Sequence, residues 1–360
     1  MTRGPWSLAR GRALVRRGPN AECAALSSHL RPLAIVATVL SLVAAPLGTG
    51  AIARDLGTFT FTLDNDLFGG SDRYYTNGVR LAWRSPAYSP PAWVGAVGRI
   101  GGPLLPADGE RRWGLALGQS LFTPEDISRE EPDPNDRPYA AWLYGAFNLS
   151  SARATSLSRL EIQLGVIGPA ALGEQAQNTV HRINRGQEAR GWDAQLENEP
   201  GLNVIASRIW RFNRPLGDRE SAWAIGALPS VTASLGNINT HAAAGLTVRV
   251  GRHLDADFGP PRIRPSVSGS SFVRRDRGWG GYVFAGVEGR AVARDIFLDG
   301  NSFQDSPRVD KKPLVGELSV GAALLFPGGR LSYAHVLRTE TFDTQDSASD
   351  FGSLSLSLHF

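Results

Sequence analysis

The stretch DNDLFGGSDRYYTNG, residues 64–78, brings many hydrogen-bonding side chains together around a short glycine-containing turn. Strand-like alternation on both sides of the turn predicts a hairpin, in which Asp66 and Thr76 meet and Asn65 lies on the rim beside them. Carboxylate, amide and hydroxyl oxygens are the ligands that a hard cation such as Ca²⁺ takes. Polar hairpin tips also make the local hydrogen bonds of Asx turns. These residues therefore indicate either a cation site or a polar turn.

A second group of residues that could do chemistry lies in a long connection, residues 169–200. Its first half, ALGEQAQNTVHRIN, predicts a short helix over residues 171–184, on which Gln177 and His181 lie one turn apart. Glu188 follows after a glycine-containing bend. A histidine with a carboxylate within reach is a general-base arrangement, whereas a solvated surface histidine is the alternative. We expect this long loop to fold over the first hairpin.

The segments that must position these residues alternate between apolar and polar side chains with a period of two, as a one-sided strand does. In the C-terminal FGSLSLSLHF, the leucines fall on one face and the serines on the other. About twelve such segments recur, near 57–66, 74–85, 112–122, 137–149, 157–168, 201–212, 221–235, 240–251, 280–296, 313–326, 329–341 and 351–360.

Most of these segments are about 10–15 residues long, whereas soluble strands average ~5–6 residues and tilted membrane strands need ~9–11. The pattern predicts an all-β fold, a 12-stranded antiparallel transmembrane β-barrel of the outer membrane with a short helix in an extracellular loop. Closure is required, because lipid cannot satisfy an open sheet edge. A soluble β-sandwich or closed barrel in the periplasm is the alternative.

Tyrosines and tryptophans lie mostly near segment ends, which predicts an aromatic girdle at the membrane interfaces. They are Tyr74, Tyr75, Trp83, Tyr139, Trp142, Tyr144, Trp210, Trp223, Trp279, Tyr282 and Tyr333. With the N-terminus inside, the odd-numbered connections face the cell exterior, namely 67–73, 123–136, 169–200, 236–239, 297–312 and 342–350. The inner connections 86–111 and 252–279 are long enough to hold a short helix or a further strand pair.

Residues 1–53 predict a cleaved signal peptide, which leaves residues 54–360 as a single barrel domain. An arginine-bearing region precedes the apolar run PLAIVATVLSLVAAPLG, which at about 16 residues is short of the ~20 that a membrane anchor needs. Removing the six arginines and one glutamate of this leader from the totals of 38 basic and 34 acidic residues leaves 32 and 33. The remaining chain is thus nearly neutral, and we expect no nucleic-acid partner. The only cysteine of the full sequence, Cys23, lies in the leader.

Several motifs, taken in order, resemble the outer-membrane lipid A 3′-O-deacylase family (LpxR-type). They are the Asn65–Asp66 pair, YTNG at residues 75–78, TPEDI followed by RPYAAWLYG, and GPAALGEQAQNTVHRIN followed by GWDAQLENEPGL. The resemblance extends over residues 57–360, and it is carried by the order and number of the motifs.

This resemblance implies a twelve-stranded barrel that hydrolyses the 3′-linked acyloxyacyl ester of lipid A with Ca²⁺ as its cofactor. It implies His181 as the general base, with Glu188, Asn65, Asp66 and Thr76 also essential. The implied Ca²⁺ ligands are Asp66, Asn65, Thr76 and Glu188. Its partners would be lipid A or lipopolysaccharide and the lipids of the outer membrane of a Gram-negative bacterium. We expect a monomer whose active site faces the external leaflet.

Two alternatives to this function differ in class, one enzymatic and one non-enzymatic. We find no GxSxG element, so a serine-nucleophile hydrolase has little support, although a phospholipase barrel with a Ser–His pair is a second enzymatic reading. A small porin or a structural barrel is the non-enzymatic reading. The acidic residues Glu125, Asp126, Glu130, Glu131, Asp133 and Asp136 would either share divalent ions with lipid A phosphates or form a solvated charge run.

Overall fold

A computed structural model describes residues 57–66, 74–86, 102, 105–184, 186–217, 222–261 and 278–360 of the chain. The predicted signal peptide and the tip of the first hairpin, residues 67–73, lie outside the described residues. Among the described residues, none of the helices has the length and apolar character that crossing a membrane requires.

The described residues form thirteen antiparallel strands in one sheet. They are β1 (Thr58–Asn65), β2 (Tyr74–Arg84), β3 (Glu110–Thr123), β4 (Ala140–Ala152), β5 (Ser156–Ile167), β6 (Glu199–Trp210), β7 (Phe212–Pro215), β8 (Trp223–Gly236), β9 (Asn239–Arg252), β10 (Gly280–Asp295), β11 (Leu314–Phe326), β12 (Gly329–Arg338) and β13 (Ser349–His359). The short helices are η3 (Pro169–Ala171), α3 (Gly173–Asn184), η4 (Gly191–Ala194), η5 (Leu254–Ala256) and α4 (Ile296–Asp299).

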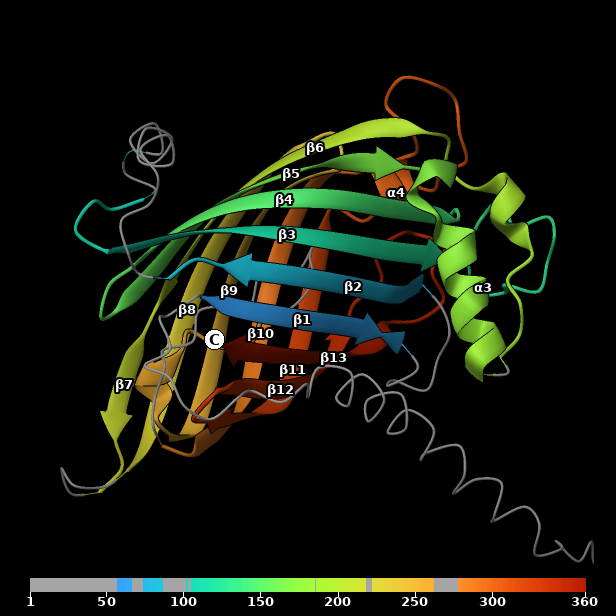
Figure 1. Ribbon diagram of the computed structural model, residues 1–360. Helices are drawn as coiled ribbons and strands as arrows, with labels where there is room; N and C mark the ends of the chain where they lie inside the picture. The colour runs from blue at the N-terminus through green and yellow to red at the C-terminus, as the bar shows by residue number, and fades with distance from the viewer. Residues whose placement is uncertain are drawn as a thin grey trace, which may run out of the picture. The chain divides into compact units, whose positions relative to one another are not determined.

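The sheet closes into a barrel with twelve positions. β1 pairs with β13, and β6 pairs with β8, so neither side of the sheet is an open edge (Figure 1). β6 and β7 occupy one position, because the register Ile209↔Ser230 of β6 continues as Phe212↔Ala227 in β7. The chain is interrupted only at Arg211 between them. The predicted 12-stranded antiparallel barrel is therefore confirmed, and the predicted strand limits agree closely with the observed ones.

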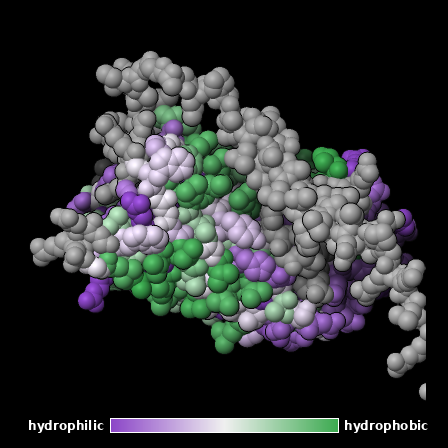
Figure 2. Space-filling view, turned by 90° about the horizontal axis from the view of Figure 1, so that it is seen from below, coloured by the Kyte–Doolittle hydropathy of each residue, from purple (hydrophilic) through white to green (hydrophobic). Residues whose placement is uncertain are grey.

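Burial alternates along each strand as the period of two predicts. In β1 the side chains of Thr58, Thr60 and Thr62 are buried in the lumen, whereas Phe59 and Phe61 on the other face are partly exposed. Figure 2 shows hydrophobic side chains gathered in a broad patch on one outer face, with hydrophilic side chains toward one end. The outer wall is thus apolar and the lumen polar, which is the pattern that a barrel in lipid requires.

The two ends of the barrel differ, and we call them the Asn65 end and the Gly57 end after the residues at either limit of β1. The connections that follow β1, β3, β5, β8, β10 and β12 all lie at the Asn65 end, as the alternation of directions predicts. These connections contain α3 and α4 (Figure 1). Of the two long connections at the Gly57 end, the described residues contain η5 and no further strand.

An aromatic cluster fills the lumen near the Asn65 end, and it corrects the predicted girdle. Three of the predicted girdle residues, Tyr75, Trp142 and Tyr144, are buried in this cluster. Tyr139 is buried under the connection between β5 and β6, and Tyr282 is buried at the Gly57 end. Phe122 of β3 stacks on Phe297 of α4 with ring centroids 4.0 Å apart, and Tyr75 packs beside Phe122. The register of β2 against β3 shifts between Tyr74 and Asn77, and such a bulge re-aims side chains. Trp223, Trp279 and Tyr333 are exposed, as the girdle prediction expects.

Buried ion pairs fill the middle of the lumen. Arg80 of β2 binds Glu161 of β5 at 2.9 Å. Across the barrel, Glu317 of β11 accepts from Arg290 at 3.0 Å and from Arg338 at 2.8 Å. Each of these buried arginines is paired with a buried glutamate of another strand, as buried charges require.

A second buried network, of ion pairs and a hydrogen bond, lies at the Gly57 end and is centred on Asp257, which directly follows η5. Asp257 accepts from Arg249 at 2.5 Å, from Arg330 at 2.6 Å and from the hydroxyl of Tyr282 at 2.6 Å. Both arginines and the aspartate are almost completely buried. One loop carboxylate thereby ties together three strands, β9, β10 and β12, at the inside of the barrel.

We expect Asp257→Asn to lower the free energy of unfolding by about 3–5 kcal/mol, because it leaves two buried guanidinium groups without their counter-charge. Urea unfolding of the barrel refolded in lipid vesicles measures this change. Asp255→Asn is the matched control, since its side chain is 81% exposed and its ion pair with Arg211 is long at 3.7 Å, so we expect less than ~1 kcal/mol. Equal effects of the two variants would contradict the prediction.

The same network gives a pH dependence of fixed sign. Burial alone would raise the pKa of Asp257, but Arg330, Arg249 and the Tyr282 hydrogen bond hold that pKa below its usual value. In the unfolded chain an aspartate titrates at ~3.9. The network's stabilisation is therefore complete above that pH and is lost as the pH falls through the lower, folded pKa. Asp257→Asn should remove this acid-dependent loss.

Candidate active site

The end of β1 places two carboxylates in a buried position at one rim of the barrel. Asp64 is the last inward-facing residue of β1, and Asp66 follows the strand directly; both are completely buried, and Asn65 between them is nearly so. The hydroxyl of Tyr75 donates to Asp64 Oδ2 at 3.4 Å. The alternation of β1 thus brings carboxylate oxygens to the rim, whereas it buries threonines deeper in the lumen.

The backbone of Thr76 lies across the hairpin from this rim. β1 and β2 pair in a regular register that ends with Asn65↔Asn77, and Asp66 and Thr76 are the next residues of the two chain segments. The meeting of the Asp66 and Thr76 side chains across the hairpin stays a prediction. Asn65, Asp66 and Thr76 form one half of the candidate site.

The long connection between β5 and β6 folds onto the outer wall of the barrel at the same end. Its residues Ala171, Ala189 and Trp192 form a buried cluster with Leu121 and Ala141, which have outward-facing positions on β3 and β4. Gln119, on the outer face of β3, donates to the carbonyl of Ala171 at 2.7 Å. The predicted helix is confirmed as α3, and Figure 1 shows it at the end of the barrel where β1 ends.

The buried face of α3 is fixed by two specific contacts. Trp192 Nε1 donates to Gln177 Oε1 at 2.8 Å, and both side chains are buried. Gly173 allows the close approach, because a Cβ there would lie 2.5 Å from the Trp192 ring and 2.6 Å from Ala141. Gln177 and His181 share this buried face, as their one-turn spacing predicts.

His181 is buried, so the alternative of a solvated surface histidine is wrong. Its Nδ1 is hydrogen-bonded to the backbone carbonyl of Gln187, in the bend that follows α3. A carbonyl can only accept, so the neutral ring must carry its proton on Nδ1, which leaves the lone pair on Nε2. Glu188 is the next residue in this bend, and it is exposed. His181 and Glu188 form the other half of the candidate site.

The structure brings the five predicted residues to one end of the barrel in these two halves. The oxygen ligands of the first half fit a hard cation in chemical type, since Ca²⁺ binds carboxylate, amide and hydroxyl oxygens. In the part of the chain that the structure describes, no group of three or more His, Cys, Asp or Glu side chains is placed to hold a metal. Amide, hydroxyl, water or substrate oxygens would therefore have to complete the coordination.

Three further residues belong to the site, although sequence reasoning did not assign them a role. Asp64 is as buried as Asp66, Trp192 holds Gln177, and the Gln187 carbonyl orients His181. The period of two along β1 could have found Asp64, because it shares the inward parity of Asp66. A backbone carbonyl carries no signal in the sequence.

The acidic connection between β3 and β4 uses its carboxylates locally. Asp126 accepts from the hydroxyl and the backbone N–H of Ser128, and these hydrogen bonds lower its pKa. Partial burial raises the pKa of Asp136, although that side chain accepts from two backbone N–H groups of the same loop. These bonds favour the interpretation of a self-contained loop over one that shares divalent ions with lipid A phosphates.

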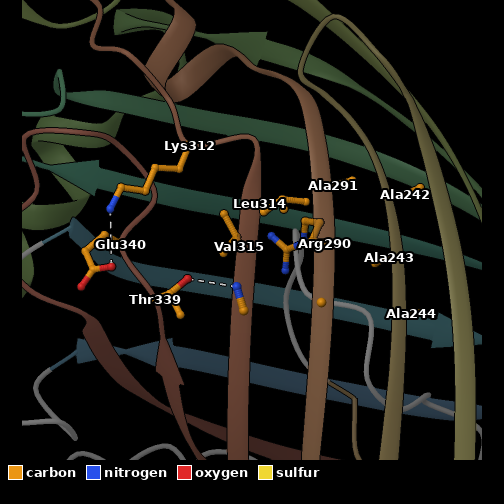
Figure 3. A pocket seen from close by; sticks show the side chains of 12 residues that line it. Ala242, Ala243, Ala244, Arg290, Ala291, Lys312, Leu314, Val315, Thr339 and Glu340 are labelled. Atoms are coloured by element: carbon orange, nitrogen blue, oxygen red, sulfur yellow. Dashed lines mark hydrogen bonds and ion pairs between the residues drawn. The ribbon is translucent and has the colours of Figure 1, made fainter.

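A depression of about 760 Å³ lies elsewhere on the barrel, over β9, β10 and β11 near the Asn65 end. It is lined by small residues such as Ala242 and Gly289 and bordered by the Lys312–Glu340 ion pair (Figure 3). None of the five predicted site residues lines it.

Comparison with known proteins identifies the family. The model of the family described as outer membrane protein LpxR matches residues 33–360. LpxR from Salmonella typhimurium has a similar structure, with 23% sequence identity and a TM-score of 0.68 over 84% of this chain and 100% of that chain. The beta domain of the Bordetella autotransporter BrkA is more distant, with 11% identity and a TM-score of 0.42 over 85% and 99% of the two chains. A search of curated proteins found no match. The chain belongs to the outer membrane protein LpxR family, the lipid A deacylase family that its motifs resemble.

Proposed function

We propose that this protein hydrolyses the 3′-linked acyloxyacyl ester of lipid A in the outer membrane, with His181 as the general base and Ca²⁺ as the cofactor. Family membership supports a lipid A deacylase of the outer membrane. The single observation that carries the proposed site is a buried histidine of fixed tautomer on α3, at the barrel end where the buried Asp64 and Asp66 lie.

In the proposed reaction, Nε2 of His181 removes a proton from a water molecule, whose oxygen attacks the carbonyl carbon of the ester. The bond between that carbon and the sugar oxygen then breaks, and the proton held on His181 passes to the departing sugar alkoxide. The Gln187 carbonyl stabilises the imidazolium formed in between, because it accepts from Nδ1 throughout. The products are a free fatty acid and a lipid A with a 3′-hydroxyl group.

Asp66, with Asn65, Thr76 or Glu188, would hold the Ca²⁺. When bound, this ion supplies positive charge that polarises the ester carbonyl and stabilises the developing oxyanion. Glu188 belongs to the bend after α3, so its participation would join the two halves of the site across the bound substrate.

The site would face the external leaflet, where lipid A resides, if the Asn65 end is the outer end of the barrel. The connections that contain α3 and α4 lie at this end, and long connections are typical of the extracellular side of outer-membrane barrels, although two further long connections lie at the Gly57 end. A porin needs a water-filled lumen, whereas the lumen here is filled by an aromatic cluster and by buried ion pairs. This filling disfavours the non-enzymatic alternative of a small porin.

Expression in a Gram-negative host followed by mass spectrometry of its lipid A tests the proposal. We expect a lipid A that has lost one acyloxyacyl unit from the 3′ position, because ester hydrolysis there releases both chains together. A structural barrel or a porin predicts an unchanged lipid A mass. Loss of a chain from another position would overturn the 3′ assignment.

A further inference from the structure

We propose that α3 is an interfacial helix whose exposed apolar stripe inserts among the acyl chains of the leaflet at the Asn65 end. The stripe consists of Ile183 and Leu172, which are exposed, and of Ala176 and Val180, which are half-buried. Ile183 is 72% exposed and Leu172 is 52% exposed. The spacing of four and three residues within the helix places these side chains on one side of it.

The rest of the helix surface is divided as an interfacial helix requires. Gln177 and His181 form the face that is buried in the protein. Glu174, Gln175 and Arg182 are exposed and polar, and they lie on the remaining side. A short helix with separate apolar and charged exposed faces is typical of elements that lie in the membrane interface.

The stripe is continuous with the lipid-facing wall of the barrel. Leu172 is joined to that wall, because its carbonyl accepts from Gln119 Nε2 at 3.4 Å. On the same outer face of β3, Leu117 is two residues from Gln119, or ~7 Å along the strand, and it is 56% exposed. Ala176 packs partly against the outer-wall cluster that includes Leu143 and Val166. The partner of the stripe is therefore the same hydrocarbon that covers Leu117.

The backbone of Leu172 supports a role for its side chain outside the protein. Its φ of 58° lies in the left-handed region, where leucine is strained and glycine or asparagine is favoured. The side chain is half exposed, so burial within the protein does not explain why a leucine occupies this position. Contact with acyl chains supplies the missing reason.

Depth-dependent quenching tests the insertion without using enzymatic activity. In a Cys23→Ser background, Ile183→Cys is labelled with an environment-sensitive fluorophore and the protein is reconstituted in phosphatidylcholine vesicles with and without brominated acyl chains. We expect quenching at least about twofold stronger than for Gln175→Cys, on the polar side of the same helix, and similar to that for Leu117→Cys. Quenching no stronger at 183 than at 175 would overturn the inference. A heat-dependent shift in gel mobility selects the folded barrels.

A second measurement rests on the proposed deacylase function. Leu172→Asn suits the left-handed backbone, so it should preserve folding while removing the apolar contact. We expect Leu172→Asn and Ile183→Ser to lower deacylation of lipid A in vesicles about tenfold, as the loss of one buried apolar side chain implies, with a much smaller effect on lipid A dispersed in detergent. Equal losses in both assays would contradict insertion. If no activity is found in either assay, the proposed function fails, whereas the quenching result still decides the insertion.

Discussion

Replacing His181 with alanine is expected to lower the rate of lipid A deacylation by a factor of about 10²–10⁴, which is the contribution that a general base usually makes. The side chain is buried on α3 and its Nδ1 is held by the Gln187 carbonyl, so only Nε2 is available to accept a proton from water. Mass spectrometry of lipid A from cells that express the variant would show the intact parent species instead of the deacylated one.

His181→Asn separates the chemical role from the structural one. The asparagine amide can still donate to the Gln187 carbonyl and so keep the bend after α3 in place, but it cannot act as a base. We therefore expect His181→Asn to be as inactive as His181→Ala while its unfolding midpoint stays closer to that of the parent protein. His335→Ala is the control, because this histidine lies on β12, where it contacts Asp350. Activity retained in His181→Asn would refute the role as a base.

The strands could be predicted because a barrel wall in lipid enforces one rule at every position. Thr60 must face the lumen and Phe61 the hydrocarbon, so polar and apolar side chains alternate with a period of two in the sequence of each strand. Burial alternates with this period along β11 and most of β13, and both strands were predicted to within two residues at each end. The strand parity also predicts the register of the first hairpin, in which Asn65 pairs with Asn77.

The parts that could not be predicted depend on contacts between distant segments. Leu117 and Leu121 have the same parity on β3, yet Leu117 is 56% exposed and Leu121 only 3%. The loop that contains η4 covers Leu121 and leaves Leu117 uncovered. The girdle prediction failed for Tyr75 for a similar reason. A one-residue bulge and the aromatic ring of Phe122 turn it into the lumen, and neither is visible in the local pattern.

The candidate site shows the same division between local and distant information. The period of the helix placed His181 on the face of Gln177, and both are buried as that spacing predicts. The state of the ring is set by the backbone of Gln187, six residues later, and the position of the helix is set by Trp192 and Gly173. Sequence reasoning therefore named the candidate side chains, whose catalytic roles stay a prediction, but not the groups that orient them.

Removing Ca²⁺ with a chelator is expected to abolish deacylation, and Asp66→Asn is expected to abolish the recovery when Ca²⁺ is added back. Asp64 and Asp66 are both completely buried at the end of β1, and two nearby buried carboxylates repel each other. A divalent cation offsets this repulsion and is bound by the same oxygens. Asparagine keeps the shape of Asp66 but removes its charge, so the variant should lose Ca²⁺ affinity without creating a cavity.

A thermal measurement distinguishes loss of the ion from loss of chemistry. Binding at a Ca²⁺ concentration of one hundred times the dissociation constant stabilises the folded state by ~2.7 kcal/mol, so the unfolding midpoint of the parent protein should rise on addition of Ca²⁺. Asp66→Asn should show no such rise, whereas Asp126→Asn, in the exposed loop after β3, should respond like the parent. Because His181→Asn leaves the oxygen ligands untouched, it should be inactive and still be stabilised by Ca²⁺. A Ca²⁺-dependent rise that persists in Asp66→Asn would place the ion elsewhere, and the carboxylates at the end of β1 would then need another reason to be buried.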